Sequence, residues 1–258
     1  MCVKTFVKMK IIFLGLLVFS FFLMAEEIPG GGMDLSSKYL TMPFGSFNGE
    51  NIYDHLDIRQ GTIEFWVRPI ANNKENGELS GFFFWGNASN SNSMSIYCGN
   101  KGNKIYFQVT GLDHKAVYLC GPVLSEKSWH HIAVTWENTG GQTYNLTLFV
   151  DGSPVKTLKD EVGVSDNLKR DIYIGLCKRN TKIDTLRTAN ADMAMFRISK
   201  NVRYSKAFQA SSKYGVDAET ICFFPFNGND DLKGFFYISE NKNGTVEAVK
   251  HKIEKREE

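Results

Sequence analysis

The stretch from Ser128 to Val155, SWHHIAVTWENTGGQTYNLTLFVDGSPV, predicts an antiparallel pair of strands. Apolar and polar residues alternate from Trp129 to Trp136, and again from Tyr144 to Val150. This period-two pattern is typical of strands with one buried face. A Gly-Gly loop separates the two runs, and Asp-Gly at 151–152 starts a further tight turn into SPVKTL.

Two adjacent histidines in this stretch, His130 and His131, raise the question of a catalytic or metal site. Neighbouring residues of a strand point to opposite faces of the sheet, so the two rings cannot easily share one ion. His130 is in phase with the apolar set that contains Ile132, and His131 with the set that contains Ala133. We therefore expect structural roles, with a ring nitrogen of His130 bonded locally and His131 on the opposite face.

Similar short alternating runs recur along the chain, separated by clusters of Gly, Asn, Asp and Ser. Together they predict roughly a dozen strands, hence an all-β protein, with at most one or two helical turns around NVRYSKAF. The further runs are GTIEFWVRP, GFFFWGN, SMSIYCGN, NKIYFQVTG, KAVYLCG, DIYIGL, ADMAMFRIS, TICFFPFNG and GFFYIS.

The N-terminal residues 1–25 have the pattern of a secretory signal peptide: three lysines, a short apolar run and a small residue before Glu26. We expect cleavage there and export to the extracellular space or periplasm, with an uncleaved anchor as the alternative. A Gly-rich leader (26–34) then precedes one domain (35–240). The charged tail (241–258) has the composition of a frayed helix or a disordered end.

Removal of residues 1–25 takes away three lysines and no acid, which leaves 27 basic against 28 acidic side chains and a net charge of −1. No electrostatic footprint for nucleic acid is therefore expected. No later apolar run is long enough to span a membrane. The remaining chain is long enough to bury a substantial core.

Four cysteines remain after the predicted cleavage: Cys98, Cys120, Cys177 and Cys222. An even number in an exported chain allows two disulfides, with Cys98–Cys120 and Cys177–Cys222 as the nearest-neighbour pairing. Four buried thiols are the alternative. Simple alternation places Cys98 with the core set and Cys120 with the other set, which argues against that pair. No CxxC motif is present, so a zinc site is not expected.

The order of these motifs resembles the laminin G-like jelly-roll family of the concanavalin A-like lectin/glucanase superfamily. The resemblance rests on TIEFWV, WHHIAVT running into LFVDG, and the late RIS…RYS..F segment, in this order across roughly 35–240. It implies a two-sheet antiparallel jelly-roll sandwich, commonly secreted, often supported by calcium, and often binding glycans or proteins. It does not by itself imply an activity, because one fold hosts many functions.

Hydrolytic enzymes are disfavoured by the sequence. Glycosidases of the superfamily commonly carry two Glu and an Asp at even spacing on one strand, because the mechanism needs two carboxyls across one bond. No such run occurs here, and Glu64 stands alone on its strand. The chain also has neither a G-x-S-x-G motif nor a P-loop.

Calcium is the metal that the resemblance favours. Hard cations prefer Asp, Asn and carbonyl oxygens supplied by loops. NGENIYDHLD, FNGNDDL and the start of ADMAMFRIS carry such groups, and the candidate ligands are Asp54, Asp57 and Asp192. The alternative is that these are ordinary Asp-rich turns.

A candidate ligand-binding face follows from the non-core side of three strands. If these strands share one sheet, this face carries aromatic rings beside charged and amide groups, a combination suited to sugar rings. Cross-strand aromatic packing is the alternative. The candidate ligand-binding residues are Glu64, Trp66, Arg68, Tyr106 and Tyr118.

The sequence therefore predicts a secreted, non-catalytic binding module that recognises carbohydrate or a glycosylated surface. A structural or adhesion protein that binds other proteins through its loops is the first alternative. A glycan hydrolase with atypical catalytic residues is the second, and the missing pair of carboxylates argues against it.

Overall fold

The computed structural model describes residues 32–36, 38–42, 56–70, 79–87, 91–99, 102–164, 170–178, 186–226, 236–242 and 245–251. Within these ranges the chain forms strands and no helix, which confirms the predicted all-β class. The strands are β1 (Met33–Asp34), β2 (Lys38–Met42), β3 (Gln60–Pro69), β4 (Ser80–Asn87), β5 (Ser91–Cys98), β6 (Lys104–Thr110), β7 (Ala116–Val123), β8 (His130–Gly140), β9 (Thr143–Val150), β10 (Ser153–Glu161), β11 (Ile172–Ile174), β12 (Leu176–Lys178), β13 (Leu186–Thr188), β14 (Ala191–Ser199), β15 (Thr220–Phe224), β16 (Phe236–Lys242) and β17 (Thr245–His251).

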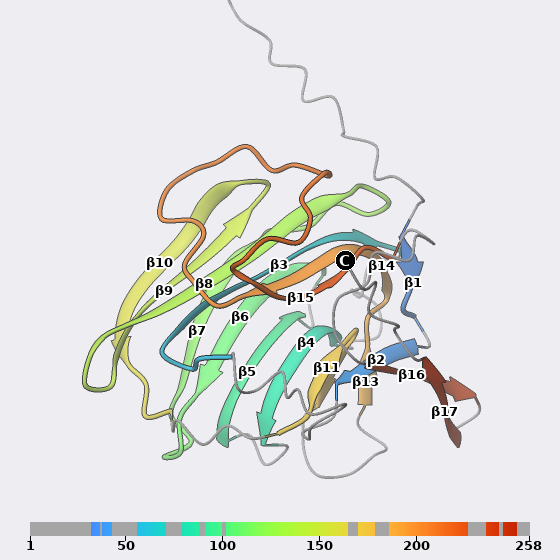
Figure 1. Cartoon of the computed structure of the whole chain (residues 1–258), viewed down its shortest axis with the longest axis horizontal. Helices are drawn as coiled ribbons and strands as arrows, with labels where there is room; N and C mark the ends of the chain where they lie inside the picture. The colour runs from blue at the N-terminus through green and yellow to red at the C-terminus, as the bar shows by residue number, and fades with distance from the viewer. Residues whose placement is uncertain are drawn as a thin grey trace, which may run out of the picture.

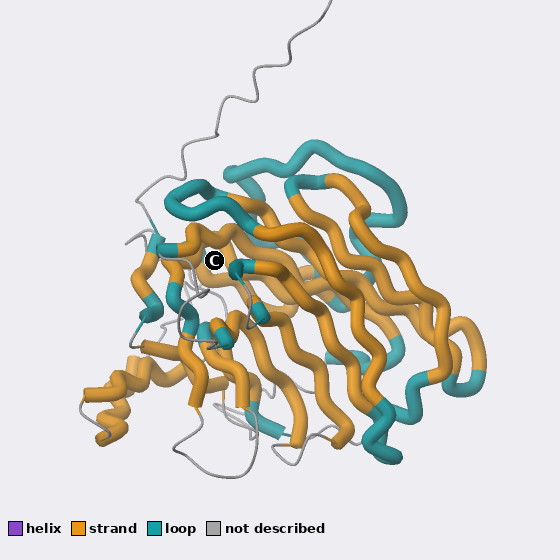
Figure 2. The backbone as a smooth tube through the Cα atoms, turned by 180° about the vertical axis from the view of Figure 1, so that it is seen from behind, coloured by secondary structure: helices purple, strands orange, loops and turns teal. Residues whose placement is uncertain are grey.

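Most strands belong to two antiparallel sheets that pack face to face as the predicted jelly-roll sandwich (Figure 1). The seven-stranded sheet has the order β1-β14-β3-β8-β9-β10, with β15 also paired to β14. The eight-stranded sheet has the order β17-β16-β2-β11-β4-β5-β6-β7. Strands β12 and β13 pair separately. Figure 2, seen from behind, shows the loops gathered at the ends of the strands.

The hairpin predicted from the opening stretch is confirmed. β8 pairs with β9 in antiparallel register from Ile132↔Val150 to Gly140↔Thr143. Asp151 and Gly152 then form a two-residue turn with φ values of 51° and 75°, and β10 follows. Two positive φ angles match the right-handed twist of the strands that the turn connects.

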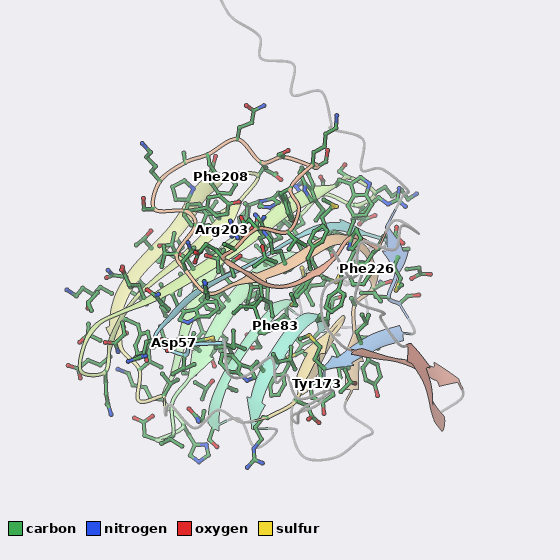
Figure 3. All side chains as sticks on the ribbon, viewed as in Figure 1. Asp57, Phe83, Tyr173, Arg203, Phe208 and Phe226 are labelled. Atoms are coloured by element: carbon green, nitrogen blue, oxygen red, sulfur yellow. The ribbon has the colours of Figure 1, made fainter. Side chains whose placement is uncertain are left out.

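The core lies between the sheets and is rich in phenylalanine. The rings of Phe65 (β3) and Phe196 (β14) stack with centroids 6.0 Å apart, and Phe83 (β4) approaches Phe196 from the opposite sheet at 6.1 Å. Figure 3 labels Phe83 in this interior layer. All three side chains are fully buried. Each such burial stabilises the fold by about 1.5–3 kcal/mol, so aromatic packing is a large part of what holds the sheets together.

Residues 200–219, which we call the cover segment, connect β14 to β15 across the outer face of the seven-stranded sheet. Figure 1 shows this orange loop arching above β8–β10. The Phe208 N–H donates to the Gly152 carbonyl at 2.9 Å. A Cβ on Gly152 would collide with the Phe208 carbonyl oxygen, so this close approach, like the positive φ, requires glycine. The helical turns that the sequence allowed around NVRYSKAF do not form: residues 201–208 have irregular backbone with bends.

Both ends of the predicted domain extend further than expected. Met33 and Asp34, which we assigned to the leader, form β1 against β14. At the other end, β16 runs past position 240 to Lys242, and β17 follows it, so that two strands extend the eight-stranded sheet beyond β2. The described residues of the tail, 241–242 and 245–251, are therefore strands rather than helix. The predicted signal peptide (1–25) lies outside the described residues. In the part of the chain that the structure describes, no helix meets the length and apolarity needed to cross a membrane.

Candidate functional site

The five residues predicted to line one ligand-binding face lie on two different sheets. Glu64, Trp66 and Arg68 are on β3 in the seven-stranded sheet, whereas Tyr106 (β6) and Tyr118 (β7) are in the eight-stranded sheet. The condition on which the predicted face depended, that these strands share one sheet, is not met, because alternation identifies the faces of a strand but not its neighbours. The two groups face opposite outer sides of the sandwich.

The cover segment buries the outer face of β3. Trp66 is only 6% exposed, and its Nε1 donates to the Ser211 carbonyl oxygen at 3.2 Å. Its ring packs in a small apolar cluster with Met195 and Phe223. Trp66 is thus a packing residue in this structure and offers no open ring face to a ligand.

Glu64 lies under the cover segment at the centre of a buried polar cluster. Nε and Nη2 of Arg197 donate to its Oε1 at 2.8 and 2.6 Å, and the Tyr204 hydroxyl donates to Oε2 at 2.8 Å. Nε2 of His131 lies 3.3 Å from Oε2, without the angle of a formed hydrogen bond. Burial by itself raises the pKa of Glu64, but these three partners outweigh burial and hold the pKa below its ordinary value.

His131 is enclosed by aromatic rings. The centroids of Trp66, Phe208 and Tyr214 lie 5.3, 5.6 and 6.0 Å from its own, each close to an edge-to-face arrangement. The prediction that the two histidines occupy opposite faces is confirmed, since His131 packs beneath the cover segment while His130 bonds at the end of the sandwich. His131 is buried because the cover segment lies over it, and the alternation of apolar and polar residues does not predict a covering loop.

Charged residues of the cover segment complete this cluster. Arg203 donates from Nη1 and Nη2 to the two oxygens of Asp217 at 2.8 and 2.6 Å. Figure 3 labels Arg203 and Phe208 above the seven-stranded sheet. A glycosidase needs two carboxyls about 5–10 Å apart on an accessible substrate. Glu64 is instead fully buried and paired with Arg197, so the cluster serves to hold the cover segment on the sheet.

The outer face of the eight-stranded sheet has a different character. Cross-strand neighbours point to the same face, and Gln108 (β6) lies between Ser95 (β5) and Tyr118 (β7). At the next position of the same face, two residues along each strand, Tyr106 (β6) lies beside Tyr97 (β5). We call Tyr97, Tyr106, Gln108 and Tyr118 the aromatic face.

Side-chain contacts order the aromatic face. The rings of Tyr97 and Tyr106 stack with centroids 5.4 Å apart and planes 13° from parallel. The Tyr97 hydroxyl donates to Oε1 of Gln108 at 3.1 Å, and Nε2 of Gln108 donates to the Thr110 hydroxyl at 2.9 Å. The amide is therefore held in one orientation. Tyr118 is 51% exposed, so its ring is open to solvent.

The Tyr106 hydroxyl of this face remains a neutral donor. Burial, with added contributions from Cys120, raises the pKa of Tyr106. Alternation places Lys104 on the same side of β6 as Tyr106. The face thus combines ring surface, fixed amide and hydroxyl groups and a cation, which can stack on and hydrogen-bond to a polyhydroxylated ligand.

The sequence identified two of these four residues, Tyr106 and Tyr118, as candidates. It placed Gln108 on the same face without naming it a candidate, and it missed Tyr97. Gln108 shares the alternation phase of Tyr106, which assigns it to the same face. Tyr97 carries a weaker signal, because Ser93 and Ser95 precede it in phase and β5 reads as an almost wholly buried strand.

The predicted calcium ligands do not converge. Asp57 accepts four hydrogen bonds from the side chain and backbone of Arg59 at 2.8–3.1 Å. Asp192 accepts two from Arg68 at 2.8 and 2.7 Å. Asp57 precedes the start of β3. Arg68, which binds Asp192, lies near the end of β3, roughly 26 Å from the start of that strand. One ion cannot bind both carboxylates. Asp54 lies outside the described residues.

Within the described ranges, no group of three or more His, Cys, Asp or Glu side chains could hold a metal ion. The Arg68 guanidinium also lies 5.1 Å from the Trp129 ring centroid, so both Arg68 and Asp192 are engaged by protein groups. These residues therefore do not fit a calcium site as the sequence predicted it.

The structure forms no disulfide among the cysteines predicted to pair. Cys98 (β5) faces the core, whereas Cys120 (β7) lies beside Tyr106 on the outer face, with β6 between their strands. Cys177 packs with Tyr173 in an outer apolar cluster, whereas Cys222 packs in the core between the sheets. A disulfide requires Cα atoms within about 7 Å and converging side chains, a condition that residues on opposite faces of nonadjacent strands do not meet.

Comparison with solved structures found similar folds at low sequence identity. The sialidase CBM40 of Ruminococcus gnavus, solved with α2,3-sialyllactose, is 12% identical with a TM-score of 0.49, over 69% of this chain and 92% of that one. The leech intramolecular trans-sialidase is 17% identical with a TM-score of 0.44, over 71% and 29%. The receptor-binding domain of botulinum neurotoxin type G is 18% identical with a TM-score of 0.39, over 58% and 36%.

Comparison with the sequences of curated proteins found no match. A family model of the laminin G type, described as the concanavalin A-like lectin/glucanases superfamily, matches residues 36–207. This range covers most of the described sandwich, from the start of β2 into the cover segment. The chain therefore belongs to the concanavalin A-like lectin/glucanase superfamily.

Proposed function

We propose that this protein is a binding module that recognises carbohydrate, or a glycosylated surface, through the aromatic face. The observation that carries the proposal is the ordered set of Tyr97, Tyr106 and Gln108 beside the exposed ring of Tyr118. Aromatic rings pack against the apolar C–H faces of sugars, while fixed amide and hydroxyl groups bond to sugar hydroxyls. Membership of a lectin-containing superfamily agrees with this proposal.

The proposal replaces the Glu64, Trp66 and Arg68 face that the sequence favoured. Glu64 and Trp66 lie beneath the cover segment, and the Arg68 side chain is bonded to Asp192. Tyr106 and Tyr118 are the members of the predicted set that remain candidates for ligand contact.

A glycan array compares the wild-type protein with Tyr118→Ala and with a matched control, Leu112→Ala. Leu112 is an equally exposed apolar residue (59%, against 51% for Tyr118) in the loop between β6 and β7. We expect wild type and Leu112→Ala to bind the same glycans, and Tyr118→Ala to bind them about tenfold more weakly, equivalent to about 1.4 kcal/mol. Tyr118→Phe, which keeps the ring, should retain most of the affinity.

A silent array from a folded protein would contradict carbohydrate recognition and favour the alternative of an adhesion protein that binds other proteins through its loops. Binding that survives Tyr118→Ala unchanged would place the glycan site elsewhere on the molecule. Thermal unfolding of each variant distinguishes lost binding from lost folding.

We also propose that the protein is exported, on the basis of the basic and apolar composition of residues 1–25. Intact mass of the protein recovered from its native host would test this. The mature chain is expected to begin near Glu26, and a mass that includes residues 1–25 would contradict cleavage.

A further inference from the structure

Ser125, His130 and Asp151 form a hydrogen-bonded chain at one end of the sandwich, away from the aromatic face. Ser125 lies in the turn between β7 and β8, His130 begins β8, and Asp151 lies in the turn between β9 and β10. The Ser125 Oγ lies 2.7 Å from Nε2 of His130, and Nδ1 of His130 lies 2.9 Å from Oδ2 of Asp151.

The hydrogen bonds determine which nitrogen of His130 carries the proton. The backbone N–H of Ser125 also points at Nε2, at 3.1 Å, and an N–H group can only donate. Nε2 is therefore an acceptor, and in the neutral ring the proton is on Nδ1, where it donates to Asp151. The Ser125 hydroxyl, at 2.7 Å, shares the single lone pair of Nε2 with the more distant N–H, and a hydroxyl that donates to an imidazole lone pair is the arrangement that lets the ring act as a general base.

Asp151 is fixed in place from both sides. Its Oδ1 accepts the His131 N–H at 2.8 Å, and its own N–H donates to the His131 carbonyl at 2.8 Å. Burial by itself raises the pKa of Asp151, but hydrogen bonds from His130 and the His131 backbone outweigh it, so the pKa is lowered. The carboxylate stays ionised and stabilises the imidazolium that forms when His130 accepts a proton.

The turn that carries Ser125 is anchored on both sides but open to solvent. The Leu124 N–H donates to the Asn103 carbonyl at 2.8 Å, and the Lys127 N–H donates to the Pro69 carbonyl at 2.8 Å. Ser125 itself is exposed, whereas the His130 side chain is only 16% exposed. A reagent can therefore reach the hydroxyl while the ring behind it is held in one position.

We propose that Ser125 is a nucleophile activated by His130, with Asp151 as a positioning residue, and that the site reacts with acyl esters. This inference goes beyond the proposed glycan binding and involves different residues. The sequence does not reveal it, because Ser125 is not in a G-x-S-x-G motif and the three residues meet only in the folded chain.

In the first step the Ser125 Oγ attacks the ester carbonyl carbon, and its proton passes to Nε2 of His130. The bond from that carbon to the leaving oxygen breaks, and the leaving oxygen takes the proton from Nε2, which releases an alcohol. Water then attacks the acylated Ser125 and gives its proton to Nε2. The acyl–Oγ bond breaks, a carboxylic acid leaves and Oγ recovers its proton, so the site returns to its starting state.

A fluorophosphonate probe tests the nucleophile on the full chain. The Ser125 Oγ would displace fluoride and form a covalent Oγ–P bond, which peptide mass spectrometry locates. Ser128 is the internal control, because it is exposed in the same turn but its hydroxyl bonds only to the Glu126 carbonyl, at 3.4 Å. We expect Ser125 to label about 100- to 10,000-fold faster than Ser128, the range of general-base catalysis.

Variants separate activation from structure. His130→Gln should reduce the rate of Ser125 labelling by a similar factor. It should also remove the decrease of this rate at acid pH, which the wild type shows because a protonated imidazole cannot act as a base. Asp151→Asn should also slow labelling, since an amide can donate to Nδ1 and favour the wrong tautomer. Thermal unfolding of each variant checks the fold, and the pH profile of the wild type keeps the test valid if a variant is unstable.

Labelling of Ser125 no faster than that of Ser128, or a wild-type rate without a fall in acid, would overturn the proposal and leave the three residues as a clamp on the β7–β8 turn. If the Ser125→Ala variant still hydrolyses p-nitrophenyl acetate at the wild-type rate, Ser125 is not the residue that turns over esters, and this part of the proposal is overturned. Leu112→Ala should label normally. The glycan array and the fluorophosphonate probe test different residues, so failure of the glycan proposal is distinguishable from failure of this one.

Discussion

Arg197 directs Nε and Nη2 at a single oxygen of Glu64, at 2.8 and 2.6 Å, and both side chains are almost completely buried. The two residues lie opposite each other on β14 and β3, so the pair crosses the seven-stranded sheet beneath the cover segment. Nη1 of Arg197 also donates to the Gly215 carbonyl at 2.9 Å, which ties the pair to the cover segment. The same pair thus joins two strands and the loop above them.

Breaking this pair should strongly destabilise the protein. In Glu64→Gln the Arg197 guanidinium stays buried without a counter-charge, which typically costs about 3–5 kcal/mol. Urea unfolding followed by tryptophan fluorescence would measure the loss in the free energy of unfolding.

The matched control for that variant is Asp192→Asn, which removes the acidic partner of Arg68. Arg68 pairs across the same two strands, but its side chain is 39% exposed. We expect a loss below about 1 kcal/mol, because water screens exposed pairs. Equal losses in the two variants would contradict a special role for burial at Glu64.

The stability of the fold should fall in acid. The partners of Glu64 hold its pKa below the ordinary value, and hydrogen bonds from Arg203 hold the pKa of Asp217 well below its ordinary value. A carboxyl with a lowered pKa in the folded state contributes stability above its unfolded pKa, and this contribution is lost as the pH falls through its folded pKa. Between about pH 5 and pH 2 the unfolded chain binds more protons, so the free energy of unfolding decreases.

Asp217→Asn provides the check on this pH dependence. The variant lacks one of the carboxyls with a lowered pKa, so its stability should change less steeply over the same acid range. Urea midpoints at intervals of pH would show this, and parallel curves for the variant and the wild type would rule out a contribution from Asp217.

Local pattern predicted the strands and their faces, but not their partners. The alternation in TIEFWV assigned Phe65 to the core and Trp66 to the other face, and both assignments hold. The pairing of β3 with β8 and β14 depends on contacts between distant parts of the chain, so Trp66 and Tyr106 were assigned to one sheet when they belong to two. Alternation also cannot show that a loop 145 residues later, at Ser211, covers Trp66.

The same limit explains the residues that the sequence missed. Ser125 and Asp151 are ordinary turn residues in the sequence, and they meet only because the β7–β8 and β9–β10 turns lie at the same end of the sandwich. By contrast, the face assignments of Cys98 and Cys120 followed from alternation alone, and the conflict that these assignments raised for a disulfide is resolved by the structure.

The two thiols Cys98 and Cys120 should differ sharply in reactivity. Burial raises the pKa of the Cys98 thiol well above its ordinary value, and its side chain is 1% exposed. Cys120 is partly exposed on the outer face. Because the thiolate is the reactive form, we expect iodoacetamide to alkylate Cys120 in the native protein and Cys98 only after unfolding. Peptide mapping would detect this order, and a linked Cys98–Cys120 peptide under non-reducing conditions would contradict it.

Tyr97→Phe tests whether the fixed amide of Gln108 takes part in glycan binding. The change removes the hydroxyl that donates to Oε1 of Gln108 at 3.1 Å but keeps the ring that stacks on Tyr106. One lost hydrogen bond of this kind is worth about 1 kcal/mol, so we expect roughly fivefold weaker binding of a glycan selected on the array. Titration calorimetry would measure the affinity, and thermal unfolding should show a stable fold. If Tyr97→Phe binds as tightly as wild type while Tyr118→Ala does not, ring stacking alone accounts for recognition on this face.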